Sequence, residues 1–326
     1  MELVILIVLF GLLFDYTNGF HDAANVVSTV IATKALAPLS AIIMAGVLNF
    51  IGATQISGVA KTISSGLIES STTSQITVLA AVVGAILWNL LTWYKSIPSS
   101  SSYALIGGLI GASWFHDGAH TVLWINLIQK VLLPMILVPL LAFGVSFVLM
   151  KFFLNKTHSA KRHALFRHLQ IGSACFVALS HGLNDAQKSM GVITLGLFVG
   201  GVIPTLQIPF WVILACAITM GLGTAFGGFR IIRTMGFSIT RLDPVQGFAA
   251  ESSASLLILA ASFLGMPVSS THMIAGSITG VGSAKGKAAV QWDTPKKLAA
   301  AWVLTLPGAG LTSALVYWLI THIFRS

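Results

Sequence analysis

Two polar signatures interrupt long apolar runs of the sequence. NGFHDAANVVSTV at residues 18–30 contains Asp22, and SHGLNDAQKSM at residues 180–190 contains Asp185. A carboxylate at the centre of a membrane span costs roughly 2.5–3.5 kcal/mol, so it usually faces the interior of a helix bundle and serves a transport pathway. Because the two acids occupy matching positions in similar motifs, we predict that both are functional and bind a cation.

Two further motifs combine a proline with a run of hydroxyl side chains. They are IPSSSSYALIGG at residues 97–108 and MPVSSTHMIAGS at residues 266–277. Proline favours the first turn of a helix, and the Ser and Thr residues after it can cap free N–H groups. A helix N-terminus attracts an anion. We therefore predict that each motif starts a helix at membrane depth and that six hydroxyls bind the oxygens of a small oxyanion: Ser100, Ser101, Ser102, Ser269, Ser270 and Thr271.

An anion and two carboxylates repel each other, so a positive species must join them. A proton, a sodium ion or a divalent metal ion would serve, and a protonated substrate oxygen could also donate to an Asp. Each ion then makes binding of the other more favourable, which is the logic of cation-coupled uptake.

Several residues beside these motifs are weaker candidates. Asn25 lies three positions after Asp22, on the same helical face, and could bind the cation or the substrate. Lys188 lies three positions after Asp185 and could pair with it in a functional or a purely structural ion pair. The candidates for proton or charge partners are Lys188, His21, His181, His272 and Glu251. For the histidines packing is the alternative role, and for Glu251 it is a position at the membrane interface.

The amino-acid composition indicates which kind of structure positions these residues. Of 326 residues, 56% are hydrophobic and only 8% are charged, whereas soluble domains carry about 25% charged residues. We predict an all-α polytopic membrane protein. The net charge of +9 does not indicate nucleic-acid binding, because the bases lack interleaved aromatic residues. The two cysteines form no disulfide framework.

Hydropathy divides the chain into about ten membrane segments. Two of them, 98–115 and 267–284, are short and rich in Gly and Ser, so they are candidates for broken or re-entrant helices. The expected segments are 2–31, 39–60, 76–94, 98–115, 121–150, 169–199, 208–229, 247–264, 267–284 and 298–320.

Basic residues predict the orientation, because Lys and Arg are retained on the cytoplasmic side. With residues 151–168 placed inside, most bases fall inside, whereas only Lys61 and Arg325 fall outside. Both termini are then outside. The residues inside are Lys34, Lys95, Lys151, Lys156, Lys161, Arg162, Arg167, Arg230, Arg233, Arg241, Lys285, Lys287, Lys296 and Lys297.

The two halves of the chain resemble each other. Asp22 and Asp185 match at an offset of 163 residues, and Pro98 and Pro267 match at 169. Each half contains five segments, an odd number, so the second copy enters the membrane upside down. Inverted repeats are a hallmark of secondary transporters, whose sites lie near the bilayer midplane. We predict an N-terminal repeat at 1–150, a basic cytoplasmic linker at 151–168 and an inverted C-terminal repeat at 169–326.

The motifs GFHDAAN at residues 19–25 and HGLNDAQK at residues 181–188, with the paired Pro-Ser elements, resemble the inorganic phosphate transporter (Pit) family over essentially the whole chain. The resemblance implies inverted repeats, symport of phosphate with a cation, no enzymatic activity and a scaffold region that often forms homodimers. It places Asp22, Asn25, Asn184 and Asp185 at cation or phosphate positions, and the six Pro-Ser hydroxyls at phosphate positions.

The sequence departs from sodium-coupled members, which typically carry GxNDxAN in both halves. His21 replaces Asn in the first motif, and Lys188 replaces the last Asn in the second. The loss of an oxygen ligand and the gain of an ammonium should weaken a sodium site. The pattern looks more like the proton-driven bacterial branch, which carries metal–phosphate complexes. The short linker also resembles compact bacterial members.

The sequence therefore predicts a multi-pass protein of the bacterial plasma membrane that takes up inorganic phosphate by alternating access. A proton is the expected coupling ion and sodium the alternative, with a divalent metal carried alongside phosphate. Three alternatives stay open at this point. They are a permease for sulfate or arsenate, an anion channel, and an intramembrane aspartyl protease, although GLND at 182–185 differs from the GxGD of that class.

Overall fold

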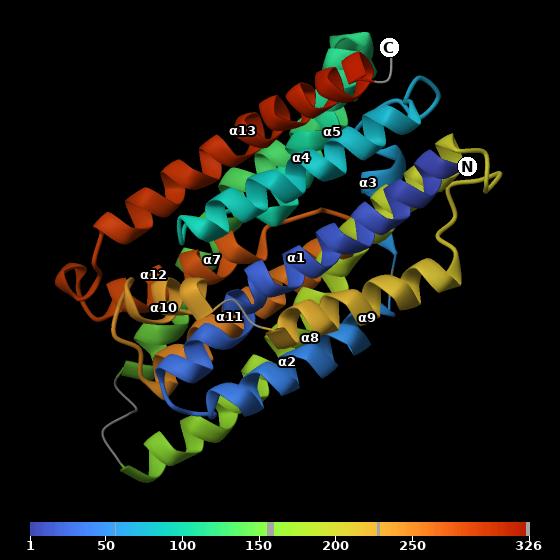
Figure 1. The fold of residues 1–326 in the computed structure, drawn as a ribbon. Coiled ribbons are helices and arrows are strands. Elements are labelled where there is room, and N and C mark those ends of the chain that lie inside the picture. The colour runs from blue at the N-terminus through green and yellow to red at the C-terminus, as the bar shows by residue number, and fades with distance from the viewer. Residues whose placement is uncertain (56, 155–159, 227–228, 324–326) are drawn as a thin grey trace.

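A computed structural model describes residues 1–55, 57–154, 160–226 and 229–323, and these residues fold almost entirely as helices (Figure 1). A π-helical stretch, Ile128–Leu132, joins α6 to α7. The α-helices are α1 Glu2–Ala32, α2 Pro38–Ala53, α3 Gly58–Ser65, α4 Gln75–Tyr94, α5 Ser101–Asp117, α6 Trp124–Leu127, α7 Leu133–Leu154, α8 Ala160–Val199, α9 Phe210–Phe226, α10 Phe229–Phe237, α11 Pro244–Phe263, α12 Ser270–Ala284 and α13 Asp293–Ile323.

Several helices are long and apolar enough to cross a bilayer. Within the described residues these are α1, α4, the continuous α6–α7 stretch and α13, and the bent pairs α2–α3 and α9–α10 meet the same criteria when each pair is taken together. With 31 residues, α1 is about 46 Å long, more than the hydrocarbon thickness. By contrast, α5 has 17 residues and α12 has 15. The chain is a multi-pass helical membrane protein.

The expected single spans at 39–60 and 208–229 each reach into a second helix, which is bent away from the first. The angle is 69° between α2 and α3 and 72° between α9 and α10. At α3, the backbone N–H groups of Val59 and Ala60 both donate to the Gln187 side chain, at 2.8 and 3.1 Å. A side chain of α8 thus supplies acceptors for the N–H groups that a helix start leaves unpaired. The apolar pattern of the sequence does not reveal this bend.

The helices α4 and α5 form one hairpin, and α11 and α12 form another of the same design. The N–H of Ser96 donates to Trp93 O at 2.9 Å, and the N–H of Gly265 donates to Ser262 O at 3.0 Å. Ser96 and Gly265 also share a left-handed backbone, with φ of 57° and 64°. Such a conformation costs a serine more than a glycine. The two hairpins thus share the same turn at positions 169 residues apart.

An extended segment separates this turn from the second helix of each hairpin. Pro98 and Pro267 lie in this segment, two residues before the N-cap residues Ser100 and Ser269. The expectation that proline occupies the first helical turn is therefore wrong, whereas the expected serine cap is present. Proline here keeps the preceding backbone extended, which disfavours a continuous helix.

The element bounds of the two halves correspond closely. Adding 169 to the bounds of α4 gives Pro244–Phe263, which is α11, and the starts of α5 and α12 are related by the same offset. Adding 169 to the α6–α7 stretch, 124–154, gives the bounds of α13, Asp293–Ile323. The sequence repeat therefore continues into the order and length of the helices.

The two ends of the bundle differ. Figure 1 places both ends of the chain at one end of the bundle, and α7 ends and α8 begins at the opposite end. At that opposite end the Arg167 Nε–H donates to Ala35 O, 3.4 Å away, which ties the start of α8 to the loop after α1. The expected linker at 151–168 overlaps the end of α7 and the start of α8, and its Lys156, like Arg325 near the C-terminus, lies outside the described residues.

The crossing of α2 and α8 depends on two glycines. A Cβ atom at Gly182 would lie 2.1 Å from Asn49 O, and one at Gly52 would lie 2.1 Å from Leu179 O. Small residues at such positions let helix backbones approach closely. We expect Gly182→Ala to destabilise the protein by about 1–3 kcal/mol, because overpacking forces the helices apart. The measurement is thermal unfolding in detergent.

Gly172 on the same helix provides the matched control. A Cβ atom there would have no atom within 4 Å. Gly172→Ala should leave stability unchanged or raise it by up to about 1 kcal/mol, through helix propensity alone. Equal melting temperatures for the two variants would contradict the close-approach explanation.

Candidate cation and anion site

The middle of the molecule contains a cluster of buried polar side chains. Four elements meet there: α1 and α8 contribute residues from their interior, and α5 and α12 contribute their first turns. Asp22 is 2% exposed and Asp185 is 0% exposed, so neither carboxyl group faces the surface. The structure brings the acids of α1 and α8 together with hydroxyls of both hairpins.

Asp22 contacts its own α1 neighbour and both hairpins. Its Oδ2 accepts a hydrogen bond from Ser101 Oγ at 2.5 Å, and its Oδ1 accepts one from Thr271 Oγ1 at 3.3 Å. His21 Nδ1 lies 2.9 Å from the same Oδ1. Ser101 also contacts Asn18 Oδ1 at 2.5 Å. A single carboxylate thus joins the starts of α5 and α12.

Asp185 has a more basic environment. Its Oδ1 forms an ion pair with Lys188, and its Oδ2 lies 3.0 Å from His181 Nε2. Ser270 Oγ donates to the same Oδ2 at 2.9 Å. The pair of Ser270 and Asp185 in the second half corresponds to the pair of Ser101 and Asp22 in the first.

The residues three positions after the acids each bond to a hydroxyl of the opposite half of the chain, and Lys188 also bonds to its own half. Asn25 Nδ2 donates to Thr271 Oγ1 at 2.8 Å and lies 3.3 Å from Ser270 Oγ. Lys188 Nζ donates to Ser102 Oγ and, at 2.9 Å, to Val268 O. These exchanged contacts lock the two hairpins together at the centre of the molecule.

Both hairpin helices present their N-termini to this cluster. The Ser100 hydroxyl accepts from the N–H of Tyr103 at 3.2 Å, and the Ser269 hydroxyl accepts from the N–H of His272 at 3.3 Å. The N–H groups of the first two residues of each helix have no acceptor within the helix. Together with the neighbouring hydroxyls, they are suited to bind the oxygens of a small anion.

A metal ion would find a suitable set of donors beside this anion site. Ligand atoms of Asp22, His181 and Asp185 all lie within 4.8 Å of one another. His181 Nδ1 lies 3.2 Å from Asn49 Oδ1, while the amide nitrogen of Asn49 donates to Thr224 Oγ1 at 2.8 Å. A neutral ring with its proton on Nδ1, toward Asn49 Oδ1, would direct its Nε2 lone pair at Asp185. A cation held by both the imidazole and the carboxylate would explain why the Nε2 lone pair of His181 faces an oxygen of Asp185.

The charges of the cluster favour cations. With neutral imidazoles, the two carboxylates and the Lys188 ammonium sum to one negative charge. A phosphate anion would increase this negative charge in a region where attraction and repulsion are both strong. The cluster can therefore hold an anion only when one or more cations accompany it.

Three predicted residues have their side-chain contacts outside the central cluster. Asn184 Nδ2 donates to Ser262 Oγ at 2.7 Å and points toward the turn of the second hairpin. The His272 ring stacks on Trp302, with ring centroids 4.0 Å apart. Glu251 is fully buried elsewhere along α11, so its expected alternative at the membrane interface does not apply.

Sequence reasoning missed Asn18 and Asn49. Asn18 precedes Asp22 by four residues, just as His181 precedes Asp185, so both side chains lie on the same helical face as the acid. That spacing could have identified Asn18. Asn49 has no comparable signal, because its role becomes visible only where α2 crosses α8.

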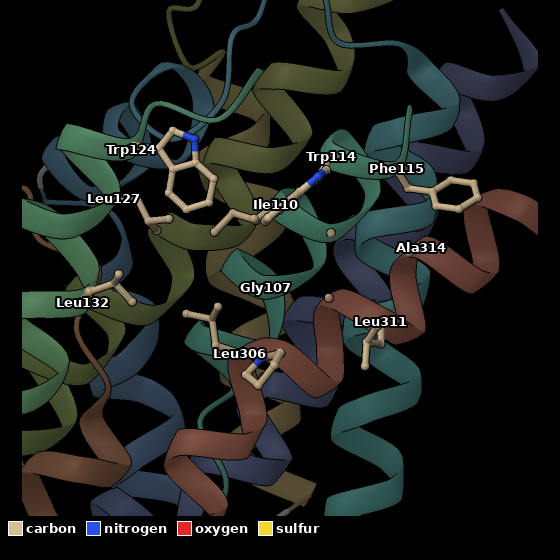
Figure 2. A pocket seen from close by; sticks show the side chains of 13 residues that line it. Gly107, Ile110, Trp114, Phe115, Trp124, Leu127, Leu132, Leu306, Leu311 and Ala314 are labelled. Carbon is tan, nitrogen blue, oxygen red and sulfur yellow. The ribbon is translucent and has the colours of Figure 1, made fainter. Parts of the chain in front are cut away.

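The hollow drawn in Figure 2 is a different feature. It has a volume of about 490 Å³ and lies along the later turns of α5, against α6 and α13. Its wall includes Trp114, Trp124, Leu306 and Leu311, and no lining residue is charged. An apolar wall does not suit a small, strongly hydrated anion.

Long apolar helices around a sealed cluster of acids, hydroxyls and paired helix starts define a polytopic membrane transporter. Residues 18–313 match the model of the phosphate transporter family. The chain therefore belongs to this family, which consists of transporters and not of enzymes.

Relatives and a solved structure agree with this assignment. The chain is 42% identical to the "Probable low-affinity inorganic phosphate transporter" of Bacillus subtilis (strain 168), over 99% of this chain and 98% of the relative. It is 44% identical to the protein of the same description from Mycobacterium tuberculosis (strain ATCC 25618 / H37Rv), over 98% and 78%. The structure titled "The sodium-dependent phosphate transporter" superposes with a TM-score of 0.90 at 26% identity, and covers 99% of this chain and 100% of that chain.

Proposed function

We propose that this protein takes up inorganic phosphate by cation-coupled symport, with protons as the coupling ion. Phosphate binds at the starts of α5 and α12. Asp22 and Asp185 bind the coupling cation or a divalent metal carried with phosphate. The observation that carries the proposal is the direct contact of Asp22 with Ser101 and Thr271, one from each hairpin.

The membrane arrangement that we propose consists of ten segments in two inverted repeats. Each half supplies one long helix, one bent pair, one hairpin of two helices and one further long stretch. The two hairpins run in opposite directions. From the centre, α5 runs toward the end that holds both termini, and α12 runs toward the other end (Figure 1). Two broken elements that meet midway from opposite sides are typical of transporters with inverted repeats.

The closure of the site supports the proposed alternating access. The central acids and the hydroxyls that contact them are at most 2% exposed, so phosphate cannot enter until one side opens. We propose that opening separates the exchanged contacts of Asn25 with Thr271 and of Lys188 with Ser102. Phosphate and its cation would replace these contacts when bound, and this replacement would favour closure.

The proposed orientation places both termini outside a bacterial plasma membrane. The end opposite the termini contains Arg167 beside the loop after α1, and the ion pair of Lys285 with Asp243, 2.5 Å long, links the first residue after α12 to the N-cap of α11. Basic residues are retained on the cytoplasmic side. A homodimer is compatible with this arrangement.

The decisive experiment is phosphate uptake into proteoliposomes that contain the purified protein. Labelled phosphate should accumulate under an inward pH gradient, and an inward sodium gradient at constant pH should add little. A second series with and without Mg²⁺ or Mn²⁺ tests the metal–phosphate complex. Uptake that depends on sodium alone would contradict proton coupling but not phosphate transport.

Two alternatives have distinct outcomes in the same vesicles. A sulfate or arsenate permease would show stronger competition by that anion than by unlabelled phosphate. An anion channel would give conductance without saturable, cation-dependent uptake. The burial of the site favours a transporter, because the central acids and the hydroxyls that contact them are at most 2% exposed.

A further inference from the structure

A line of polar residues follows the face of α1 that packs against α8. Asp15, Asp22 and Thr29 are spaced seven residues apart, so they lie on one side of the helix at intervals of about 10 Å. On α8, Ser189 lies four residues after Asp185 and therefore shares its face. The central site thus lies in the middle of a longer polar seam between two apolar helices.

Asp15 occupies the seam on the side of the N-terminus. It is 0% exposed, and its Oδ1 accepts a hydrogen bond from Ser189 Oγ at 2.6 Å. Its Oδ2 has no hydrogen-bond partner in the described part of the chain. The titratable groups that face it are Asp185 on α8 and Cys216 on α9, and α4 has no charged residue.

Glu251 of α11 occupies the seam on the other side of the central site. It is 0% exposed and accepts hydrogen bonds from Thr29 at 2.5 Å, Gln170 at 3.1 Å and Ser173 at 2.5 Å. The titratable group that faces it is Cys175 on α8. Among residues whose side chains the structure describes, the bases on the helices packed against α11 are His21 of α1, Lys61 of α3, Lys151 of α7, His272 of α12 and, on α8, Arg167, His168, His181 and Lys188.

No ion pair of either acid is present among the residues that the structure describes, in contrast to Asp185 with Lys188. A buried ionised carboxylate without a countercharge is strongly disfavoured, so a proton or a cation must accompany each group. Their donors are hydroxyls and an amide, which suit a group that gains and loses a proton. In the described part of the chain, the side-chain hydrogen bonds of these two acids go to Ser189, Thr29, Gln170 and Ser173 and not to the residues of the central site.

The internal repeat does not require these acids. The position that matches Asp15 at an offset of 163 is Ala178, and the position that matches Glu251 at 169 is Val82. The corresponding positions in the other half of the chain are therefore occupied by small or apolar residues. The two acids are additions to the repeated scaffold, one on each side of its centre.

We propose that Asp15 and Glu251 are the flanking steps of a proton pathway along the α1–α8 seam, one on each side of the Asp22–Asp185 site. This inference rests on the proposed proton-coupled uptake of phosphate. A proton enters from water and forms an O–H bond at one flanking carboxylate. It then breaks that bond as it passes, through water in the seam, to the central acids, and it leaves through the other flanking carboxylate.

The test compares net uptake with exchange in proteoliposomes that contain Asp15→Asn, Glu251→Gln or wild-type protein. Net uptake under a pH gradient requires protons to cross, and a pH-sensitive dye inside the vesicles reports them. Exchange of labelled internal for unlabelled external phosphate requires no net proton movement. We expect each variant to lose about 100-fold of net uptake and acidification, the scale of a positioned proton carrier, and to keep exchange within about twofold of wild type.

The controls separate this pathway from other causes. Asp117→Asn changes an acid at the exposed end of α5 and should alter neither process. Asp15→Glu keeps a carboxyl group and should restore acidification, which a merely structural role would not predict. Variants that acidify the vesicles like wild type, or that lose exchange and net uptake equally while melting normally, would overturn the pathway. Loss of exchange in the wild type would instead overturn the proposed function.

Discussion

Asp22→Asn should abolish phosphate uptake while the protein still inserts and folds. The amide has nearly the same shape but no negative charge, and only one of its two positions can accept a hydrogen bond. Asp22 accepts from Ser101 through one oxygen and from Thr271 through the other, so the variant cannot hold both hairpins and a cation at once. We expect uptake to fall at least about 100-fold, which corresponds to about 2.7 kcal/mol.

The measurement is initial uptake of labelled phosphate per amount of inserted protein, at several pH values. Asp117→Asn is the matched control, because its side chain is 46% exposed and lies far along α5 from the site. Thermal unfolding in detergent shows whether Asp22→Asn remains folded. Uptake near the wild-type rate would remove Asp22 from the mechanism and leave the hydroxyls without their central acceptor.

Much of this site could be predicted from sequence because the costs of polar residues in lipid are large. Asp22 and Asp185 stand out for that reason, and the repeat identifies them as a pair. The serines of the two Pro-Ser motifs are recognisable as caps, and the N-cap roles of Ser100 and Ser269 follow the expected chemistry. The cost of a carboxylate in lipid thus identified the acids, and the preference of serine for N-cap positions identified the helix starts.

The details that the sequence did not reveal depend on contacts between distant helices. Gln187 of α8 binds the start of α3, and this contact explains a bend that an apolar run such as 39–60 does not reveal. Asn49 of α2 orients His181 in the same way. Glu251 looked interfacial because it lies near the start of α11, yet neighbouring helices cover it completely. Such pairings appear only when the helices are packed.

The contacts of Lys188 also explain why its position differs from the motif of sodium-coupled members. Sodium-coupled members are expected to carry an asparagine at this position. Here the Lys188 ammonium forms an ion pair with Asp185 and donates a hydrogen bond to Ser102 in the first turn of α5. A fixed cation in the site reduces the number of mobile cations that phosphate needs. This contact supports the proposed proton coupling, because a proton, unlike sodium, requires no set of oxygen ligands.

Lys188→Met should cause a large loss of stability as well as of uptake. Removal of one member of a fully buried ion pair leaves Asp185 with the Ser270 hydroxyl as its hydrogen-bond donor, beside the Nε2 atom of His181. The cost of a buried charge left without its partner is about 3–5 kcal/mol. Thermal unfolding in detergent should therefore show a much lower melting temperature for Lys188→Met than for wild type.

The double variant Asp185→Asn with Lys188→Met separates stability from function. Because no unpaired charge remains, it should recover most of the lost melting temperature, as neutral replacements of buried ion pairs often do. It should still fail to take up phosphate, since the second carboxylate and the ammonium that contacts Ser102 are both gone. If the double variant were as unstable as Lys188→Met, the lysine would act mainly through packing, and the charge balance proposed for phosphate binding would need another source of positive charge.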